Sequence, residues 1–229
     1  MYLSRLMLNP RSRQVQRELA DLYEMHRTVS RAFPKGVFRV NRQNGDATDV
    51  LFRVDVHPRT GAPTLLVQSR QPPDWSYLSD DRKSYLLGLE ELPVGVENPA
   101  VKPIRFSLKA GQVLAFRLRA NPTVKKDRED KKQGYRVGLY REEDQLKWLE
   151  RKVELAGAIL LTVQVSKDER AKGKLFLEAQ DDKRMRFVSV QFDGILQVKD
   201  PARLREAVET GIGSGKAMGF GLLSLARAN

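Results

Sequence analysis

A helix, a glycine-rich loop and a strand follow one another in DPARLREAVETGIGSGKAMGFGLLSLA, residues 200–226. Asp200 followed by Pro201 is typical of a helix start, because Asp caps free amides and proline fits the first helical turn. The predicted helix ends at Gly211, and an apolar strand follows over 220–226. Glycine is favoured where the backbone turns left-handed or approaches another group closely. The five glycines of residues 211–221 therefore raise the question of what this backbone approaches.

The segments before this one complete the second half. Alternating apolar residues predict strands, and a three- to four-residue apolar spacing with early acidic residues predicts a helix. The strands are predicted over 112–120, 159–166, 174–180 and 186–198, the helix over 141–157, and a charged loop over 123–135. If one of these strands is set aside as an extra hairpin strand, the order of the second half is strand–helix–strand–strand–helix–strand. This is the order of a ferredoxin-like fold, on which RNA-recognition motifs are built.

The first half begins in the same way. A strand is predicted over 2–9 and a helix over 15–34, where five apolar residues recur at helical spacing. These residues are Leu19, Leu22, Met25, Val29 and Phe33. Strands over 49–57 and 64–71 can form a hairpin, and a loosely helical stretch follows over 75–92.

Proline and glycine without helical period predict a linker over 91–103. The sequence therefore predicts two domains, 1–95 and 103–229. The expected fold class is α+β, with tandem ferredoxin-like (RRM-like) domains and antiparallel sheets.

The net charge of +12 indicates a polyanionic partner such as nucleic acid, although a basic surface kept for solubility is the alternative. Most of the excess lies in residues 101–229, which carry 27 Lys and Arg against 17 Asp and Glu. The absence of cysteine excludes disulfides, thiolate zinc sites and cysteine nucleophiles. Only His26 and His57, far apart in the sequence, remain as histidine ligands, so we expect no metal site. No signal peptide or membrane span is predicted, and we expect a soluble cytoplasmic protein.

The glycine loop fits neither common nucleotide motif. A Walker A loop would need glycine at Thr210 and Ser or Thr at Ala217, and a dinucleotide fingerprint would need glycine at Met218. Its amides and Lys216 could instead cradle the phosphates of a longer chain. The alternative is a turn required only for packing, which glycine content alone favours.

The stretch LYEMHRTVSRAF, residues 22–33, holds the candidate catalytic residues. On a helix, Tyr23, His26, Arg27 and Ser30 lie one turn apart on the flank of the apolar stripe. Histidine exchanges a proton near neutral pH, and arginine stabilises developing negative charge. This set could perform acid–base chemistry on a phosphodiester without metal. A half-buried histidine on a core helix is the alternative, and spacing alone favours it.

Basic residues mark a candidate RNA-binding surface in the second half. Arg117 and Arg119 lie on one face of a predicted strand, and Lys125 and Lys126 lie in the charged loop. Such groups are often only solvated, but here they agree with the overall charge.

Together these pieces resemble a known family. GIGSGKAMGFGLLSLA fits the glycine-rich signature of the repeat-associated RNA-binding proteins of CRISPR systems. The fixed positions are Gly211, Ile212, Gly213, Gly219, Phe220 and Gly221. RLRANPT and MYLSRLMLNP resemble the CasE (Cse) family, the crRNA-processing endoribonucleases of the type I-E Cascade complex, and LYEMHRTVSRAF looks like the catalytic helix of that family.

The resemblance implies a specific activity. Such an enzyme cuts CRISPR repeat RNA, the precursor crRNA, at the 3′ base of a stem-loop and stays bound to the mature crRNA as a Cascade subunit. It uses no metal or other cofactor: the 2′-hydroxyl attacks, leaving a 2′,3′-cyclic phosphate and a 5′-hydroxyl. Tyr23 and His26 match the catalytic pair, with Arg27, Ser30 and Arg31 as candidate helpers. The glycine loop, through Gly211, Gly213, Lys216, Gly219 and Gly221, is expected to approach RNA backbone.

Two other functions remain open on the sequence. One is an RNA-binding subunit that has lost cleavage, and the other is a structural ribonucleoprotein component unrelated to CRISPR. Cleavage of a hairpin repeat would distinguish the enzyme from both alternatives. Selective hairpin binding would distinguish the non-cleaving RNA-binding subunit from the structural component.

Overall fold

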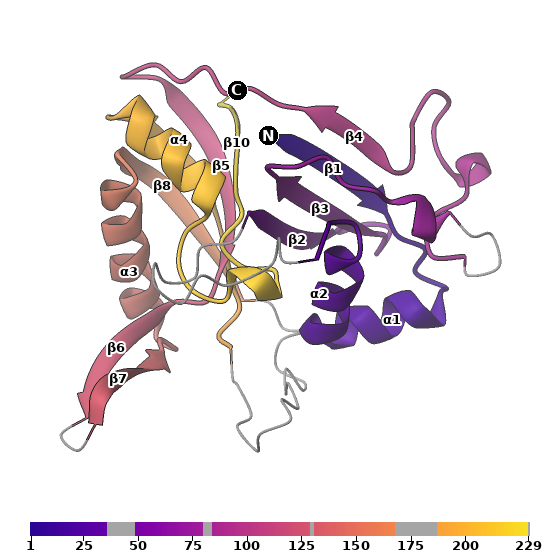
Figure 1. Ribbon diagram of the computed structural model, residues 1–229. Helices are drawn as coiled ribbons and strands as arrows, with labels where there is room; N and C mark the ends of the chain where they lie inside the picture. The colour runs from indigo at the N-terminus through magenta and orange to yellow at the C-terminus, as the bar shows by residue number, and fades with distance from the viewer. Residues whose placement is uncertain (36–48, 80–83, 129–130, 168–186, 229) are drawn as a thin grey trace. The chain divides into compact units, whose positions relative to one another are not determined.

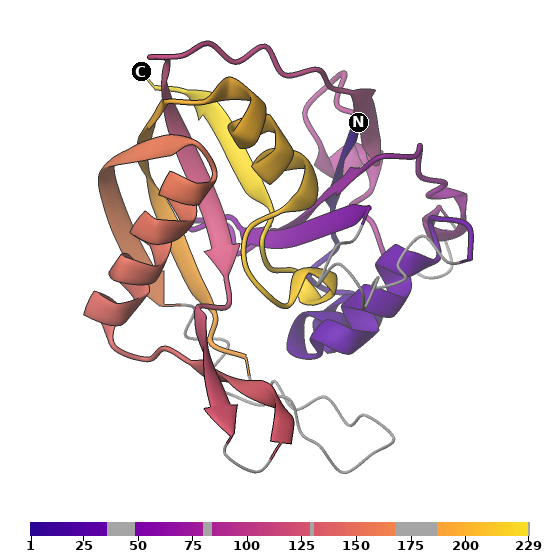
Figure 2. The same cartoon turned by 60° about the vertical axis from the view of Figure 1, so that its left-hand side comes forward.

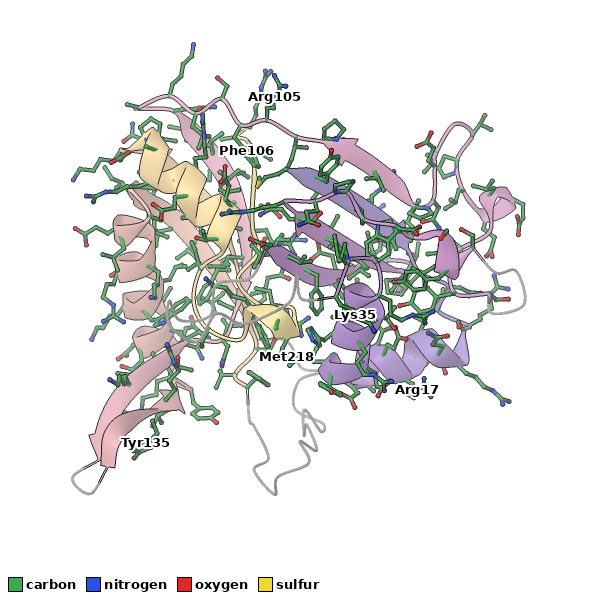
Figure 3. All side chains as sticks on the ribbon, in the orientation of Figure 1. Arg17, Lys35, Arg105, Phe106, Tyr135 and Met218 are labelled. Carbon is green, nitrogen blue, oxygen red and sulfur yellow. The ribbon has the colours of Figure 1, made fainter. Side chains whose placement is uncertain are left out.

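The computed structural model describes residues 1–35, 49–79, 84–128, 131–167 and 187–228. The chain forms two compact units, whose boundary lies between Arg105 and Phe106, both labelled in Figure 3. Unit 1 comprises Met1–Arg105 and Ala217–Gly219, and unit 2 comprises Phe106–Lys216 and Phe220–Asn229. Three residues of the glycine loop therefore belong to the first unit, although the rest of the loop belongs to the second.

Unit 1 is built on an antiparallel sheet with the strand order β2-β3-β1-β4. The strands are β1 (Tyr2–Met7), β2 (Val50–Val56), β3 (Pro63–Ser69) and β4 (Ala100–Pro103). Helices α1 (Arg13–Ala20) and α2 (Leu22–Ser30) follow β1 and cover one face of this sheet (Figure 1). In the stretch predicted to be loosely helical, the described residues include two short 3-10 helices, η1 (Ser76–Leu78) and η3 (Leu89–Glu91).

The helix predicted over 15–34 is two helices. Asp21 adopts an extended conformation (φ −131°, ψ 106°), which ends α1, and its carboxylate accepts a hydrogen bond from the backbone N–H of Tyr23 at 2.9 Å. An Asp in this position caps the next helix, so a new helix begins at Leu22. The predicted apolar stripe is confirmed: Met25 and Val29 are buried among strand residues such as Phe52.

The predicted linker over 91–103 contains β4, which this prediction missed. Residues 100–103 pair with β1, where Tyr2 lies opposite Pro103. Asn98 anchors the segment just before the strand: its side chain accepts a hydrogen bond from the Met7 N–H and donates one to the Met7 carbonyl, each at 2.9 Å. The composition resembled a linker, but the long-range ladder makes it a sheet edge.

Unit 2 has an antiparallel sheet in the order β10-β5-β9-β8, covered on one face by α3 and α4 (Figure 1). The strands are β5 (Val113–Ala120), β8 (Ala158–Lys167), β9 (Val190–Val198) and β10 (Leu223–Arg227), and the helices are α3 (Glu142–Leu155) and α4 (Pro201–Thr210). Trp148 stacks on Phe192 between helix and sheet, at 6.3 Å between ring centroids. The strand order is that of a ferredoxin-like fold, and the predicted fold class is confirmed.

The charged loop predicted over 123–135 is instead a hairpin. Strands β6 (Thr123–Arg128) and β7 (Lys131–Gly138), which follow β5 and precede α3 along the chain, pair with each other. The hairpin extends away from the unit 2 sheet (Figure 2). The strand predicted over 174–180 lies outside the described residues. In the part of the chain that is described, no helix has the length and apolar character needed to cross a membrane.

Candidate active site and nucleic-acid interface

Helix α2 carries the predicted catalytic residues near its start. Asp21 caps the helix two residues before Tyr23, which is 45% exposed. His26 lies one turn further on and is half-buried. The Tyr23 and His26 rings lie side by side, with centroids 6.2 Å apart and planes tilted by 31°. The spacing predicted from sequence thus brings a phenol and an imidazole together.

His26 is held by its surroundings in the helix and by the glycine loop. The Ser30 hydroxyl donates a hydrogen bond to the His26 carbonyl at 2.7 Å and lies 3.5 Å from Nε2 of the ring. Burial lowers the pKa of His26 below 6.5, and a hydrogen bond with the backbone of Ala217 partly opposes this effect. Because the lower pKa favours the neutral imidazole at neutral pH, His26 is suited to accept a proton.

The segment Ala217–Gly219 of the glycine loop reaches the unit 1 core. The segment contains the last two residues of the 3-10 helix η5 (Lys216–Met218) and the glycine that follows it. Met218 is labelled beside helix α2 in Figure 3. Gly219 has φ +83°, and a Cβ atom there would lie 2.9 Å from Cε2 of the buried Phe52. Glycine is therefore required by both conformation and space. The loop approaches protein here, which the sequence could not reveal.

Other glycines of the loop have packing reasons within unit 2. Gly211 ends α4 with φ +77°, and a Cβ on Gly213 would lie 2.9 Å from the Trp148 ring. A Cβ on Gly221 would lie 2.8 Å from the carbonyl oxygen of Ile212. The packing alternative thus has geometric support at these positions, while their contact with RNA stays a prediction.

Two of the predicted helpers, Arg27 in α2 and Arg31 just beyond it, are exposed. The Arg27 guanidinium contacts the Glu24 carboxylate at 3.0 Å. Arg31 lies over the Tyr77 ring, 4.4 Å from its centroid, and the Tyr77 hydroxyl donates to the Thr28 carbonyl at 2.5 Å. Burial raises the pKa of Tyr77 above its ordinary value, so this phenol remains a donor. Sequence reasoning missed Tyr77, because nothing local connects it to α2.

Arg117 and Arg119 share the outward face of β5, as predicted, and both have partners within unit 2. Arg117 Nε contacts the Asp193 carboxylate at 2.6 Å. Arg119 Nε donates to the Ser189 hydroxyl at 2.9 Å, and its guanidinium lies 5.4 Å from the Phe220 ring centroid. An RNA phosphate at Arg117 would therefore compete with an existing carboxylate.

Lys125 and Lys126 are exposed on β6, where they lie opposite Arg136 and Tyr135 of β7. Tyr135 is 43% exposed and is labelled on the hairpin in Figure 3. The hairpin therefore carries cations and an aromatic ring on a protruding element, the combination that binds nucleic acid through charge and stacking.

A pocket of about 400 Å³ brings three predicted RNA-binding residues together. Gly211, Gly213 and Lys216 line it with Lys152 and Arg203, and Glu206 also lies on its wall. Burial, followed by the charges of Arg151 and Arg136, lowers the pKa of Lys152. An anion entering this pocket would relieve the crowding of positive charge.

Comparison with known proteins gives full-length matches. A family model described as CRISPR associated protein matches residues 1–227. The CRISPR-associated endoribonuclease Cse3 of Thermus thermophilus is 34% identical over 99% of this chain and 100% of its own length. The Cascade subunit CasE of Escherichia coli is 32% identical over 99% of both chains.

Solved structures agree. Cse3 bound to 19-nt RNA has a TM-score of 0.74 at 36% identity, covering 99% of this chain and 100% of that one. Thermus thermophilus Cse3 bound to an RNA representing a pre-cleavage complex has a TM-score of 0.72 at 36% identity and 98% coverage of both chains. With a family model spanning nearly every residue and relatives above 30% identity across their whole length, this chain belongs to the CRISPR-associated protein family that includes Cse3 and CasE.

Proposed function

We propose that this chain is a metal-independent endoribonuclease that binds the stem-loop of CRISPR repeat RNA and cuts precursor crRNA at its 3′ base. The full-length similarity to the endoribonuclease Cse3 and to its RNA-bound structures carries the proposal. The adjacent Tyr23 and His26 rings support it, because a phenol and a neutral imidazole supply the proton transfers that this reaction needs.

The proposed reaction requires one base, one acid and one stabilising charge. A base removes the proton of the 2′-hydroxyl, whose oxygen forms a bond to the adjacent phosphorus. The bond from phosphorus to the 5′-oxygen breaks, and an acid protonates that oxygen. The products are a 2′,3′-cyclic phosphate and a 5′-hydroxyl. Because the attacking group belongs to the RNA itself, the step requires no metal-bound water.

We assign His26 to proton transfer and Tyr23 to orientation or proton transfer. Burial keeps His26 neutral at neutral pH, so it is competent as a base before RNA binds. Arg27 and Arg31 are helpers that would stabilise charge on the phosphorane. Ser30 is a helper by position, since its hydroxyl lies 3.5 Å from Nε2 of the His26 ring.

We place RNA binding on the glycine loop, the hairpin and the outer face of β5. The residues are Arg117, Arg119, Lys125, Lys126, Gly211, Gly213, Lys216, Gly219 and Gly221. The cationic pocket at Lys216 and the protruding β6–β7 hairpin support this assignment through their charge. We further propose that the protein works in the cytoplasm and keeps the mature crRNA as a subunit of Cascade with other subunits, as the relative CasE is named.

Single-turnover cleavage of a repeat hairpin tests the proposal. Wild-type protein should cut the hairpin in excess chelator, and a substrate with 2′-deoxyribose just 5′ of the cut should bind without reacting. Loss of cleavage in chelator that magnesium restores would contradict the mechanism. Binding of both substrates without any cleavage would instead identify a non-cleaving RNA-binding subunit.

A further inference from the structure

A buried carboxylate joins the two helices of unit 1. Glu18, in α1, is 1% exposed and accepts hydrogen bonds from three side chains. The donors are Gln14 Nε2 at 2.8 Å, Thr28 Oγ1 at 2.7 Å and Tyr85 Oη at 2.5 Å. Only Gln14 belongs to the same helix. The other two donors connect Glu18 to α2 and to the segment after β3.

These bonds act on the part of α2 that carries His26. Thr28 lies two residues after His26 and is held twice, since its hydroxyl donates to Glu18 and its carbonyl accepts from Tyr77. The Tyr85 hydroxyl also lies 4.0 Å from the sulfur of Met25, the residue before His26. Contacts on both sides of His26 along the chain therefore fix the rotation and height of α2.

A carboxylate is an unusual choice for this place. Apolar side chains alone could pack α1 against α2, and a buried charge is costly unless hydrogen bonds satisfy it. Here Oε1 accepts from Gln14 and Thr28, and Oε2 accepts from Tyr85. Directional bonds of this kind select one arrangement, whereas apolar contacts tolerate sliding. Burial and then the charge of Glu18 raise the pKa of Tyr85, which keeps this phenol protonated as a donor.

We infer that Glu18 is a positioning residue for cleavage, which holds α2 in the orientation that places Tyr23 and His26 at the scissile phosphate. The inference rests on the proposed function, and Glu18 acts through Thr28 without touching RNA. Misplacement of reacting groups by about 1 Å can cost on the order of 100-fold in rate. The rate advantage of holding α2 in place can therefore outweigh the free-energy cost of burying the Glu18 carboxylate.

Glu18→Gln tests the inference with little change in shape. Glutamine has one acceptor oxygen and one donor group, so it cannot accept from Thr28 and Tyr85 with both of its polar atoms. We expect single-turnover cleavage to fall roughly 10- to 100-fold while the Kd for the uncleaved hairpin stays unchanged. Thr28→Val removes the same bond from the α2 side and should give a similar loss. The double variant should lose little more than either single variant.

The titration of His26 gives a readout that a purely structural role would not move. Loosening α2 reduces the burial of the ring, and burial is the main cause of its low pKa. In Glu18→Gln, the His26 titration followed by NMR without RNA should therefore move toward higher pH. Ser4→Ala is the matched control, because the buried hydrogen bond that it removes in unit 1, from Trp75 Nε1 at 3.1 Å, involves no residue of α2. This variant should lose stability but keep the rate and the titration.

The outcomes are distinct. Wild-type cleavage and an unchanged His26 titration in folded Glu18→Gln would overturn the inference, as would an equal rate loss in Ser4→Ala. If Glu18→Gln does not fold, Thr28→Val decides by the same criteria. If His26→Ala cleaves at the wild-type rate, the catalytic assignment fails, and the NMR titration still reports whether Glu18 positions the ring.

Discussion

The backbone of Ala217 hydrogen-bonds with the side chain of His26, so the glycine loop and the candidate catalytic helix meet within unit 1. Gly219, two residues later, seats this segment against Phe52 where no side chain fits. The loop that identified the family thus also contributes to the environment of the proposed catalytic histidine.

Gly219→Ala should displace this segment. The new Cβ would meet Phe52 at 2.9 Å, and the positive φ adds strain of about 1–2 kcal/mol. We expect slower single-turnover cleavage, because Ala217 moves away from His26. Gly61→Ala is the control, since Gly61 also lies in unit 1 with φ +69° but has open space around its Cβ position. Equal rate losses in the two variants would show that backbone strain alone is responsible.

His26→Ala and Tyr23→Phe should slow cleavage of the bound hairpin more than they weaken its binding. General acid–base groups typically contribute roughly 10²–10⁴-fold to a rate. Single-turnover rates and hairpin Kd values should be measured together, with circular dichroism to confirm folding. A variant that cuts at the wild-type rate would return its residue to a packing role.

The stability of the free protein should depend on pH through His26. Its folded pKa lies below 6.5, so the unfolded chain binds the proton first. The free energy of unfolding should therefore decrease as pH falls below 6.5, until the folded pKa is passed. Urea unfolding of wild type and His26→Gln between about pH 5 and 7.5 checks this: the variant should show a smaller decrease. Parallel curves would contradict the burial of an ionisable ring at this position.

Charge reversal on the β6–β7 hairpin should weaken RNA binding. Each phosphate contact contributes roughly 0.7–0.9 to the slope of log K against log salt. Lys125→Glu with Lys126→Glu should lower hairpin affinity and flatten that slope, while the rate of the bound complex stays nearly unchanged. Lys102→Glu with Lys109→Glu makes the same change in net charge at exposed positions. Identical salt slopes in the two double variants would mean that only overall charge matters.

The sequence predicted what depends on local order along the chain. Strand and helix order identified both ferredoxin-like halves, and helical spacing indicated that Tyr23 and His26 lie close together. Sequence analysis failed where a residue's structural partners lie far away along the chain. The hairpin over 123–138 looked like a loop because its composition is charged and its stability comes from cross-strand pairing. Sequence analysis did not single out Glu18, because its donors Thr28 and Tyr85 lie 10 and 67 residues away along the chain.

Asp21 shows how a single residue can make the prediction of a helix wrong. The apolar stripe continues through it, so periodicity indicated one helix, whereas its extended backbone and capped amide create two. The glycine loop is a different case: its signature could be recognised in the sequence, but the fold alone identifies Phe52 and His26 as neighbours of residues 217–219.

The membership of Ala217–Gly219 in unit 1 has a consequence for biosynthesis. A ribosome makes β1, α2 and the rest of the first unit early, but the residues that complete the surroundings of His26 emerge only after almost all of unit 2. While residues 106–216 are being made, the nascent first unit therefore has its histidine only partly enclosed. A product truncated before residue 217 would keep Tyr23 and His26 yet lack this enclosure, so complete synthesis of the chain is coupled to assembly of the site.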